Sequence, residues 1–370
     1  MKFVIAIDSF KGSVSSAQAC ASVKKGLLKA IPDAEVIIKP IADGGEGTLD
    51  AMVPKDGRHV VEVCNPLFQK TKAEYGAING TAVIEMACAA GLTLIDEEAR
   101  NAGRTTTYGV GEMIRHALDN GFKKIMLTAG GSATNDGGCG MFSALGAVFK
   151  DTDGKAFIPT GDSLSRIADI DLSGVVRGFY ECEFTIATDV KNLLLGPQGA
   201  TSVYGPQKGL EDGQEQLIEN GMKSYSEILK NLSGIDVAKI EGSGAGGGIA
   251  LPLLAFAKSA INSGIDTVLD VVDFNSALEG ADAVITGEGK MDVQSLYGKA
   301  ISGVTERASV MGVPVYCFVG CVGGEKEKLK EMGISEIYTV ASRAKSTGDS
   351  MKNASAYLTE IAEEFAKSFK

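Results

Sequence analysis

The apolar positions near the N-terminus fall into two patterns, one typical of a buried strand and one typical of a helix. Residues 3–7 (FVIAI) form a continuous apolar run, as expected for a strand buried on both faces of a parallel sheet. Apolar residues then recur every four positions from Ala19 to Ile31, which predicts a helix that ends before Pro32-Asp33. Residues 34–38 (AEVII) form a second apolar run. This β-α-β pattern predicts the start of a doubly wound sheet.

The same alternation returns near the C-terminus, whereas the middle of the chain differs. Short apolar runs follow one another between residues 60 and 87 with no helical stretch between them, which favours antiparallel or mixed pairing in a separate unit. The C-terminal part predicts strands at 281–286, 313–320 and 336–341, and helices near 298–311, 325–332 and 350–369.

These patterns predict an α/β protein with two unlike α/β domains. Residues 1–60 and 281–370 form a discontinuous domain around a parallel sheet, and residues 61–280 form an inserted domain with a mixed sheet. A chain of 370 residues is long enough for each domain to bury its own core.

Composition and charge narrow the choice of partners and location. The net charge of −11 leaves no basic surface for nucleic acid or an anionic membrane, so an anionic substrate would need a local positive pocket. The seven cysteines form no C-x-x-C pair and are expected to be reduced thiols. Without a signal peptide or a long apolar span, the expected location is cytoplasmic.

Glycine-rich polar turns follow several predicted strands, where ligands bind in open α/β sheets. Glycine lets backbone N–H groups approach phosphate oxygens. In a single turn of this kind, however, the glycine more often only permits a backbone conformation with positive φ. Their repetition with embedded charged residues favours a binding site. The turns are DSFKGS (8–13), ADGGEGT (42–48), GGSATNDGG (130–138), ATDVKN (187–192), GPQKG (205–209), GSGAGGG (242–248) and GEGKMDVQS (287–295).

Standard nucleotide motifs do not account for these turns. Gly242, Gly244 and Gly247 match G-x-G-x-x-G, but the segment before them is a poor buried strand, so close helix packing is the alternative to dinucleotide binding. No Walker-type phosphate loop and no protein-kinase signature set occurs.

Carboxylates and lysines are mixed within the turns, as phosphoryl transfer requires. Carboxylates can hold magnesium or orient the attacking hydroxyl, and a lysine can neutralise developing phosphoryl charge. Capping of helices and turns is the alternative role for each carboxylate, and for Asp8 and Asp292 it explains the residue equally well. The residues are Asp8, Asp43, Glu46, Asp136, Asp189, Glu288 and Asp292, with Lys11, Lys208, Lys290 and Lys299.

Taken in order, the turns resemble those of the bacterial-type glycerate kinase family, which phosphorylates D-glycerate with ATP. The similarity extends over nearly the whole chain and includes LGPQGAT (195–201), GMFSALGA (140–147) and GEGKMDVQSLYGKAISGV (287–304). It implies a Rossmann-like discontinuous domain, an active site in a cleft between the domains, ATP with Mg²⁺, and phosphorylation at the 2-hydroxyl. Leu193 departs from the family pattern, in which proline follows the position of Asn192.

The resemblance suggests a role for each turn residue, although the sequence does not show which carboxylate is the base and which ones hold the metal. Asp189 is the expected base and Lys11 balances phosphoryl charge. Asp8, Ser132, Asn135, Asp136 and Lys208 are expected to bind substrate, and Asp43 and Glu46 to hold Mg²⁺. Gly44, Gly45, Gly287, Glu288 and Gly289 are expected to bind the nucleotide. A kinase for a related hydroxy or sugar acid, and a non-catalytic two-lobed metabolite-binding module, remain alternatives, and a homo-oligomer is left open.

Overall fold

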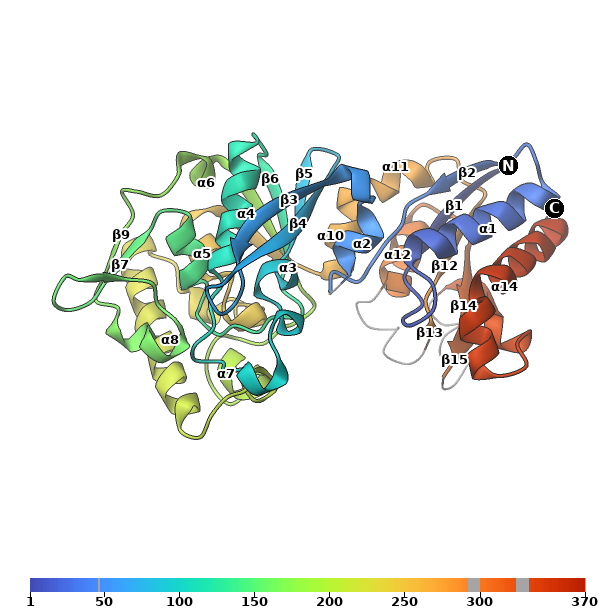
Figure 1. Cartoon of the computed structure of the whole chain (residues 1–370). Helices are drawn as coiled ribbons and strands as arrows, with labels where there is room; N and C mark the ends of the chain where they lie inside the picture. The colour runs from blue at the N-terminus through green and yellow to red at the C-terminus, as the bar shows by residue number, and fades with distance from the viewer. Residues whose placement is uncertain (46, 292–299, 324–332, 370) are drawn as a thin grey trace. The chain divides into compact units, whose positions relative to one another are not determined.

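The computed structural model describes residues 1–45, 47–291, 300–323 and 333–369 (Figure 1). Its contacts divide the chain into two compact units. Unit 1 comprises Met1–Asp43, Asp50–Pro54 and Ser263–Lys370, and unit 2 comprises Gly44–Leu49 and Lys55–Asn262. Each unit contains its own sheet.

Unit 1 is built on a five-stranded sheet in which every neighbouring pair is parallel. The strands lie in the order β16-β14-β12-β1-β2, so the chain order along the sheet reverses between β1 and β12. Such a reversal is the point where doubly wound sheets bind ligands. The bounds are β1 (Lys2–Ile7), β2 (Glu35–Ile38), β12 (Ala283–Gly287), β14 (Val315–Val319) and β16 (Ile334–Thr339).

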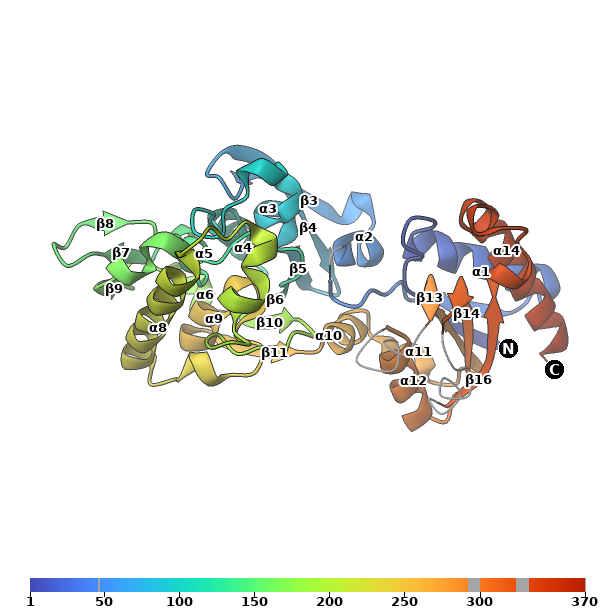
Figure 2. The ribbon, with the colours of Figure 1, turned by 90° about the horizontal axis from the view of Figure 1, so that it is seen from below.

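Helices cover both faces of this sheet (Figure 2). Phe3 and Ile5 pack with Leu27 of α1 (Ser16–Ala30) and Ile361 of α14 (Thr347–Ser368). Val4 is equally buried and points to the opposite face, where α12 packs against β12 and β14. The remaining elements of unit 1 are α10 (Gly264–Val271), α11 (Phe274–Leu278), α12 (Ala300–Val310), and the parallel pair β13 (Lys290–Met291) and β15 (Cys321–Val322).

Unit 2 contains a six-stranded mixed sheet in the order β11-β10-β6-β5-β4-β3. Its first four strands are parallel to one another, while β4 pairs antiparallel with β5 and β3. The α/β class and the mixed second sheet are therefore as predicted. The bounds are β3 (Arg58–Cys64), β4 (Lys70–Ile78), β5 (Thr81–Glu85), β6 (Lys124–Thr128), β10 (Glu183–Ala187) and β11 (Lys258–Asn262).

Helices and a small second sheet complete unit 2. The small sheet has the order β8-β7-β9. No helix among the described residues is long and apolar enough to cross a membrane. The bounds are α3 (Ala87–Ala90), α4 (Tyr108–Asp119), α5 (Cys139–Ala144), β7 (Val148–Lys150), β8 (Ala156–Phe157), β9 (Asp169–Asp171), α6 (Arg177–Glu181), α7 (Ala200–Tyr204), α8 (Gln214–Ser233) and α9 (Leu251–Phe256); α2 (Thr48–Met52) spans the division between the units.

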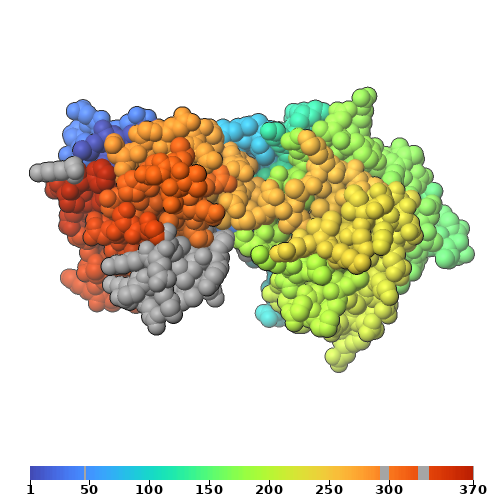
Figure 3. Space-filling model, turned by 180° about the vertical axis from the view of Figure 1, so that it is seen from behind, coloured from blue at the N-terminus to red at the C-terminus, as the bar shows by residue number. Residues whose placement is uncertain are grey.

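Unit 1 draws its surface from both ends of the chain, as the blue and the orange-to-red atoms of Figure 3 show. The sequence placed the return to this domain at residue 281, whereas the contacts place it at Ser263. The difference arises because α10 packs on α12, and the Arg307 guanidinium donates to the Asp270 carboxylate. The helix predicted at 325–332 lies outside the described residues.

One close helix contact in unit 1 generates a stability prediction. A Cβ built on Gly26 of α1 would lie 2.2 Å from the Thr359 carbonyl oxygen of α14. Gly26→Ala should gain about 1 kcal/mol of helix propensity but lose roughly 1–3 kcal/mol or more to overpacking against the backbone. We expect a net decrease in Tm, measured by scanning calorimetry.

Gly348→Ala is the matched control, because Gly348 lies in the first turn of α14 with only the Ser346 hydroxyl at 4.0 Å from its added methyl. Its Tm should hold or rise. An equal decrease in both variants would contradict the packing explanation.

Candidate active site

A pocket of about 610 Å³ lies in unit 1 at the carboxyl ends of its strands. Asp8 follows β1 and Glu288 follows β12, so the pocket opens at the reversal of strand order. Gly320, after β14, and the first turn of α14 complete the walls. The sequence thus placed DSFKGS and GEGK at the correct edge of the sheet.

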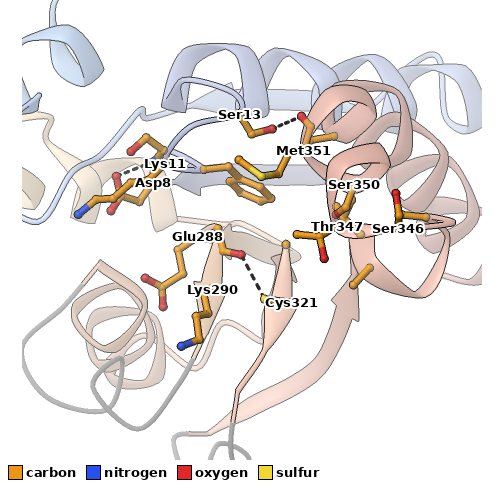
Figure 4. A pocket seen from close by; sticks show the side chains of 18 of the residues that line it. Asp8, Lys11, Ser13, Glu288, Lys290, Cys321, Ser346, Thr347, Ser350 and Met351 are labelled. Atoms are coloured by element: carbon orange, nitrogen blue, oxygen red, sulfur yellow. Dashed lines mark hydrogen bonds between the residues drawn. The ribbon is translucent and has the colours of Figure 1, made fainter.

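One side of the pocket carries a concentration of charge. The labelled side chains of Asp8, Lys11, Glu288 and Lys290 lie on this side in Figure 4, and Asp43 also lines the pocket. The pKa of Asp8 is raised to about 7, chiefly by burial and in smaller part by the negative charges of Asp43 and Glu288, against the bond from the Ser9 N–H and the charge of Lys11. The three carboxylates lie close enough to one another for the charges of Asp43 and Glu288 to disfavour ionisation of Asp8.

The other side of the pocket is apolar and hydroxyl-rich. Figure 4 shows Met351 and the hydroxyls of Ser346 and Thr347 on this side, and Phe10 and Val340 add apolar lining to the pocket. The Ser13 hydroxyl donates to the Met351 carbonyl and so ties the loop after β1 to α14. The α14 residues were not among the predicted site residues, because no glycine-rich turn precedes them. The S-x-x-D pattern at 346–349, which marks the start of the helix, is the signal in the sequence that points to them.

The predicted nucleotide-binding glycines divide between different environments. Gly289 lines the pocket. Gly287 does not, because it is buried in β12, where a Cβ would lie 1.8 Å from the Phe318 carbonyl oxygen. The structure thus gives Gly287 a packing role. Gly44 and Gly45 group with unit 2 and are not among the residues that line this pocket.

Glu85, which the sequence analysis did not select, organises the loop that contains Gly44 and Gly45. This buried carboxylate at the end of β5 accepts from the Gly47 N–H at 2.8 Å and the Leu49 N–H at 3.1 Å. Glu85 therefore holds the amino end of α2 in place. Glu46, predicted as a metal ligand, lies outside the described residues.

In unit 2 the loop 130–138 follows β6, and Asp136 is buried within it. The carboxylate accepts from the Thr107 N–H and hydroxyl and from the Gly138 and Gly140 N–H groups, at 2.8 to 3.2 Å. Burial raises the pKa of Asp136, although these hydrogen bonds oppose the shift. Both carboxylate oxygens of Asp136 are thus engaged within the protein, and its predicted contact with substrate stays a prediction.

Lys208 also acts on this loop from inside the protein. It is 2% exposed, and its ammonium donates to the Ser132 hydroxyl and to the Thr134 carbonyl, both at 2.8 Å. Burial lowers the pKa of Lys208 to about 7, partly offset by the charge of Asp136. Asn135 is buried as well, and its amide donates to the Thr201 hydroxyl.

The glycines of 242–248 pack against the same loop. A Cβ on Gly247 would lie 2.1 Å from the Thr134 carbonyl oxygen, and the Gly137 N–H donates to the Gly247 carbonyl at 3.0 Å. This close backbone approach explains the glycines of GSGAGGG, so the packing alternative is the one that the structure supports over dinucleotide binding.

Asp189 lies at the same edge of unit 2 as loop 130–138, because β10 and β6 are parallel neighbours. Its side chain is exposed. Asn192 is held in this loop by bonds to the Gln198 carbonyl and the Tyr204 hydroxyl. Leu193, which follows Asn192, is 43% exposed.

The carboxylates around Asp8 are suitable ligands for a magnesium ion. Among the described residues no three His, Cys, Asp or Glu side chains converge as a complete metal-ligand group. Mg²⁺ commonly takes only one or two carboxylates and fills its shell with water and phosphate oxygens. The neighbouring carboxylates of Asp8, Asp43 and Glu288 supply donors of that kind.

The raised pKa of Asp8 generates a prediction about pH. Between its ordinary value of 3.8 and about 7, the folded chain binds a proton that the unfolded chain has released, so this group lowers stability as pH rises through that window. Asn keeps an oxygen for the Ser9 N–H but cannot ionise. The Tm of Asp8→Asn minus that of the wild type should be larger at pH 8 than at pH 5 in metal-free buffer.

Asp33→Asn is the charge-matched control, since it removes an exposed carboxylate from the same unit. Its Tm difference from the wild type should be the same at both pH values. If Asp8→Asn behaved like this control, the negative charge of Asp8 would not be destabilising.

Comparison with known proteins identifies the family. The family model described as the Glycerate kinase family matches residues 3–370. Glycerate kinase of Bacillus subtilis (strain 168) is 38% identical, with 100% of this chain and 98% of the relative covered. Glycerate 2-kinase of Escherichia coli (strain K12) is 38% identical, with 92% and 90% covered. A crystal structure of a candidate glycerate kinase 2 from Salmonella typhimurium LT2 superposes with a TM-score of 0.89 at 37% identity, covering 100% of this chain and 98% of that chain. The chain therefore belongs to the glycerate kinase family, which is the resemblance that its ordered glycine-rich turns predicted.

Proposed function

We propose that this protein transfers the terminal phosphoryl group of ATP to the 2-hydroxyl of D-glycerate, giving 2-phosphoglycerate. The observation that carries the proposal is the near-full-length similarity to glycerate kinases, which include the glycerate 2-kinase of Escherichia coli. The two-sided pocket of unit 1 supports it, because a nucleotide has an apolar base and charged phosphates.

The proposal places ATP in the pocket of unit 1. The apolar side with Phe10, Val340 and Met351 suits the base, and the charged side suits the phosphates. Lys11 and Lys290 lie on that side, and either ammonium can neutralise charge that develops on the transferring phosphoryl group (Figure 4).

Magnesium completes the charge balance in this proposal. Asp8, Asp43 and Glu288 would hold the ion, and the ion would neutralise charge on the phosphate oxygens during transfer. The carboxylates alone would repel a nucleotide triphosphate, so they are expected to favour nucleotide only in its metal complex.

The acid substrate is assigned to the loop edge of unit 2. Loop 130–138 offers backbone N–H groups and the Ser132 hydroxyl, held by Asp136 and Lys208. Exposed Asp189, at the end of the neighbouring strand β10, is the proposed base that accepts the proton of the attacking hydroxyl.

The reaction and its position can be tested in one experiment. The purified protein is incubated with ATP, Mg²⁺ and D-glycerate, and phosphorus NMR resolves 2- from 3-phosphoglycerate. We expect the 2-phosphoglycerate signal, abolished by excess EDTA. Formation of 3-phosphoglycerate would overturn the position, and turnover only with another hydroxy acid would overturn the substrate.

The role of Asp189 generates a separate prediction. Loss of a general base lowers kcat by roughly 10²- to 10⁴-fold, so Asp189→Asn should show such a loss with little change in Tm or in glycerate binding. Asp153→Asn, which changes another exposed aspartate of unit 2, should retain wild-type kcat. A kcat for Asp189→Asn within threefold of the control would assign the base elsewhere.

A further inference from the structure

Arg100 differs from every other arginine of unit 2 in its bonding. Within the described part of the chain no side-chain hydrogen bond or ion pair involves Arg100, and its Nε atom is buried without a partner. The others each have an acceptor: Arg58 has Glu74, Arg104 has Asp162 and Glu211, Arg115 has the Ala144 carbonyl, Arg166 has Asp151, and Arg177 has Glu181.

Arg104 lies four residues from Arg100, so the exposure and the acceptors of the two side chains can be compared directly. The Arg104 side chain is 66% exposed and still lies near two carboxylates. Arg100 is less exposed, so its guanidinium has lost more water, yet no carboxylate compensates it within the described residues. A partly desolvated guanidinium without an acceptor is unfavourable in the free protein, and an anionic ligand would remove that penalty.

The segment that ends at Arg100 is joined to the proposed substrate loop. The Leu92 N–H donates to the Gly131 carbonyl at 2.9 Å, and the Ala133 N–H donates to the Ala90 carbonyl at 2.8 Å. Gly91 and Ser132 form an antiparallel bridge between these bonds. Residues 90–92, eight to ten positions before Arg100, therefore run along the first half of loop 130–138.

The close approach of Gly209 places Lys208 beside the same segment. The φ of Gly209 is +77°, and a Cβ there would lie 2.3 Å from the Arg100 carbonyl oxygen and 2.9 Å from the Arg100 Cβ. Only glycine allows this approach. The adjacent Lys208 extends to Ser132 and Thr134, so the backbones that carry Arg100 and Lys208 touch beside one loop.

We propose that Arg100 binds the carboxylate of the acid substrate beside loop 130–138 and thereby selects a hydroxy acid over its uncharged analogues. This inference rests on the proposed function. Lys208 differs from Arg100 because its ammonium is already used inside the protein, so Lys208 positions the loop. A guanidinium can bind both carboxylate oxygens at once, which an amide or alcohol group cannot reproduce.

The test compares Arg100→Gln with Arg104→Gln, using D-glycerate and its neutral amide, D-glyceramide, as substrates. Loss of a charge-assisted pair should raise the KM for D-glycerate about 10- to 100-fold in Arg100→Gln, with the KM for ATP changed less than about twofold. The preference for D-glycerate over D-glyceramide should fall by a similar factor. Arg104→Gln should retain both wild-type values, because the acceptors of Arg104 are protein carboxylates.

Binding without turnover supplies an independent measurement. Titration calorimetry with D-glycerate should show the same 10- to 100-fold weakening in Arg100→Gln, and Arg100→Lys should recover part of it. If D-glycerate affinity and the preference over D-glyceramide were unchanged in a folded Arg100→Gln protein, the inference would be wrong. Failure of the wild type itself to phosphorylate D-glycerate would instead overturn the proposed function.

Discussion

The buried carboxylate of Asp136 is the constraint on which the loop edge of unit 2 depends. It joins the start of α4, through Thr107, to the start of α5, through Gly138 and Gly140. Burying this charge is acceptable only because four donors surround it and because two helix amino ends face it. Removing one partner would therefore leave a buried carboxylate oxygen less well satisfied and weaken the second half of loop 130–138, where Gly137 and Gly138 lie.

Elements with strong local patterns could be predicted from the sequence. The apolar run at 3–7 requires burial on both faces of a strand. The four-residue spacing from Ala19 places the apolar side chains on one face of a helix, which packs against the core. The boundary at Ser263 could not be predicted in this way. Short helices such as α10 and α11 carry too little pattern to show which sheet they pack on, and that choice depends on contacts such as Arg307 with Asp270.

The candidate site was predictable in location but only partly in detail. Because strands in a parallel sheet end at one edge, turns after strands fall there, as Asp8 and Glu288 do. A turn motif does not show, however, whether its carboxylate faces a pocket or the protein interior. Asp8 and Asp136 both lie in a polar turn that follows a strand. Asp8 lines the pocket, whereas the carboxylate of Asp136 accepts from residues 107, 138 and 140 inside the protein. Arg100 had no motif to mark it, since its distinguishing property is the lack of a partner among the described residues.

The arrangement of unit 1 has a consequence for synthesis of the protein. Its two central strands, β1 and β12, come from opposite ends of the chain and exchange backbone hydrogen bonds. When β1 leaves the ribosome, its sheet neighbour β12 and the covering helix α14 have not yet been translated, whereas most of unit 2 is one continuous segment. Unit 2 can therefore fold during translation, while the N-terminal residues stay aggregation-prone until the C-terminal third arrives. The nascent protein is expected to need chaperone protection for its first strand in that interval.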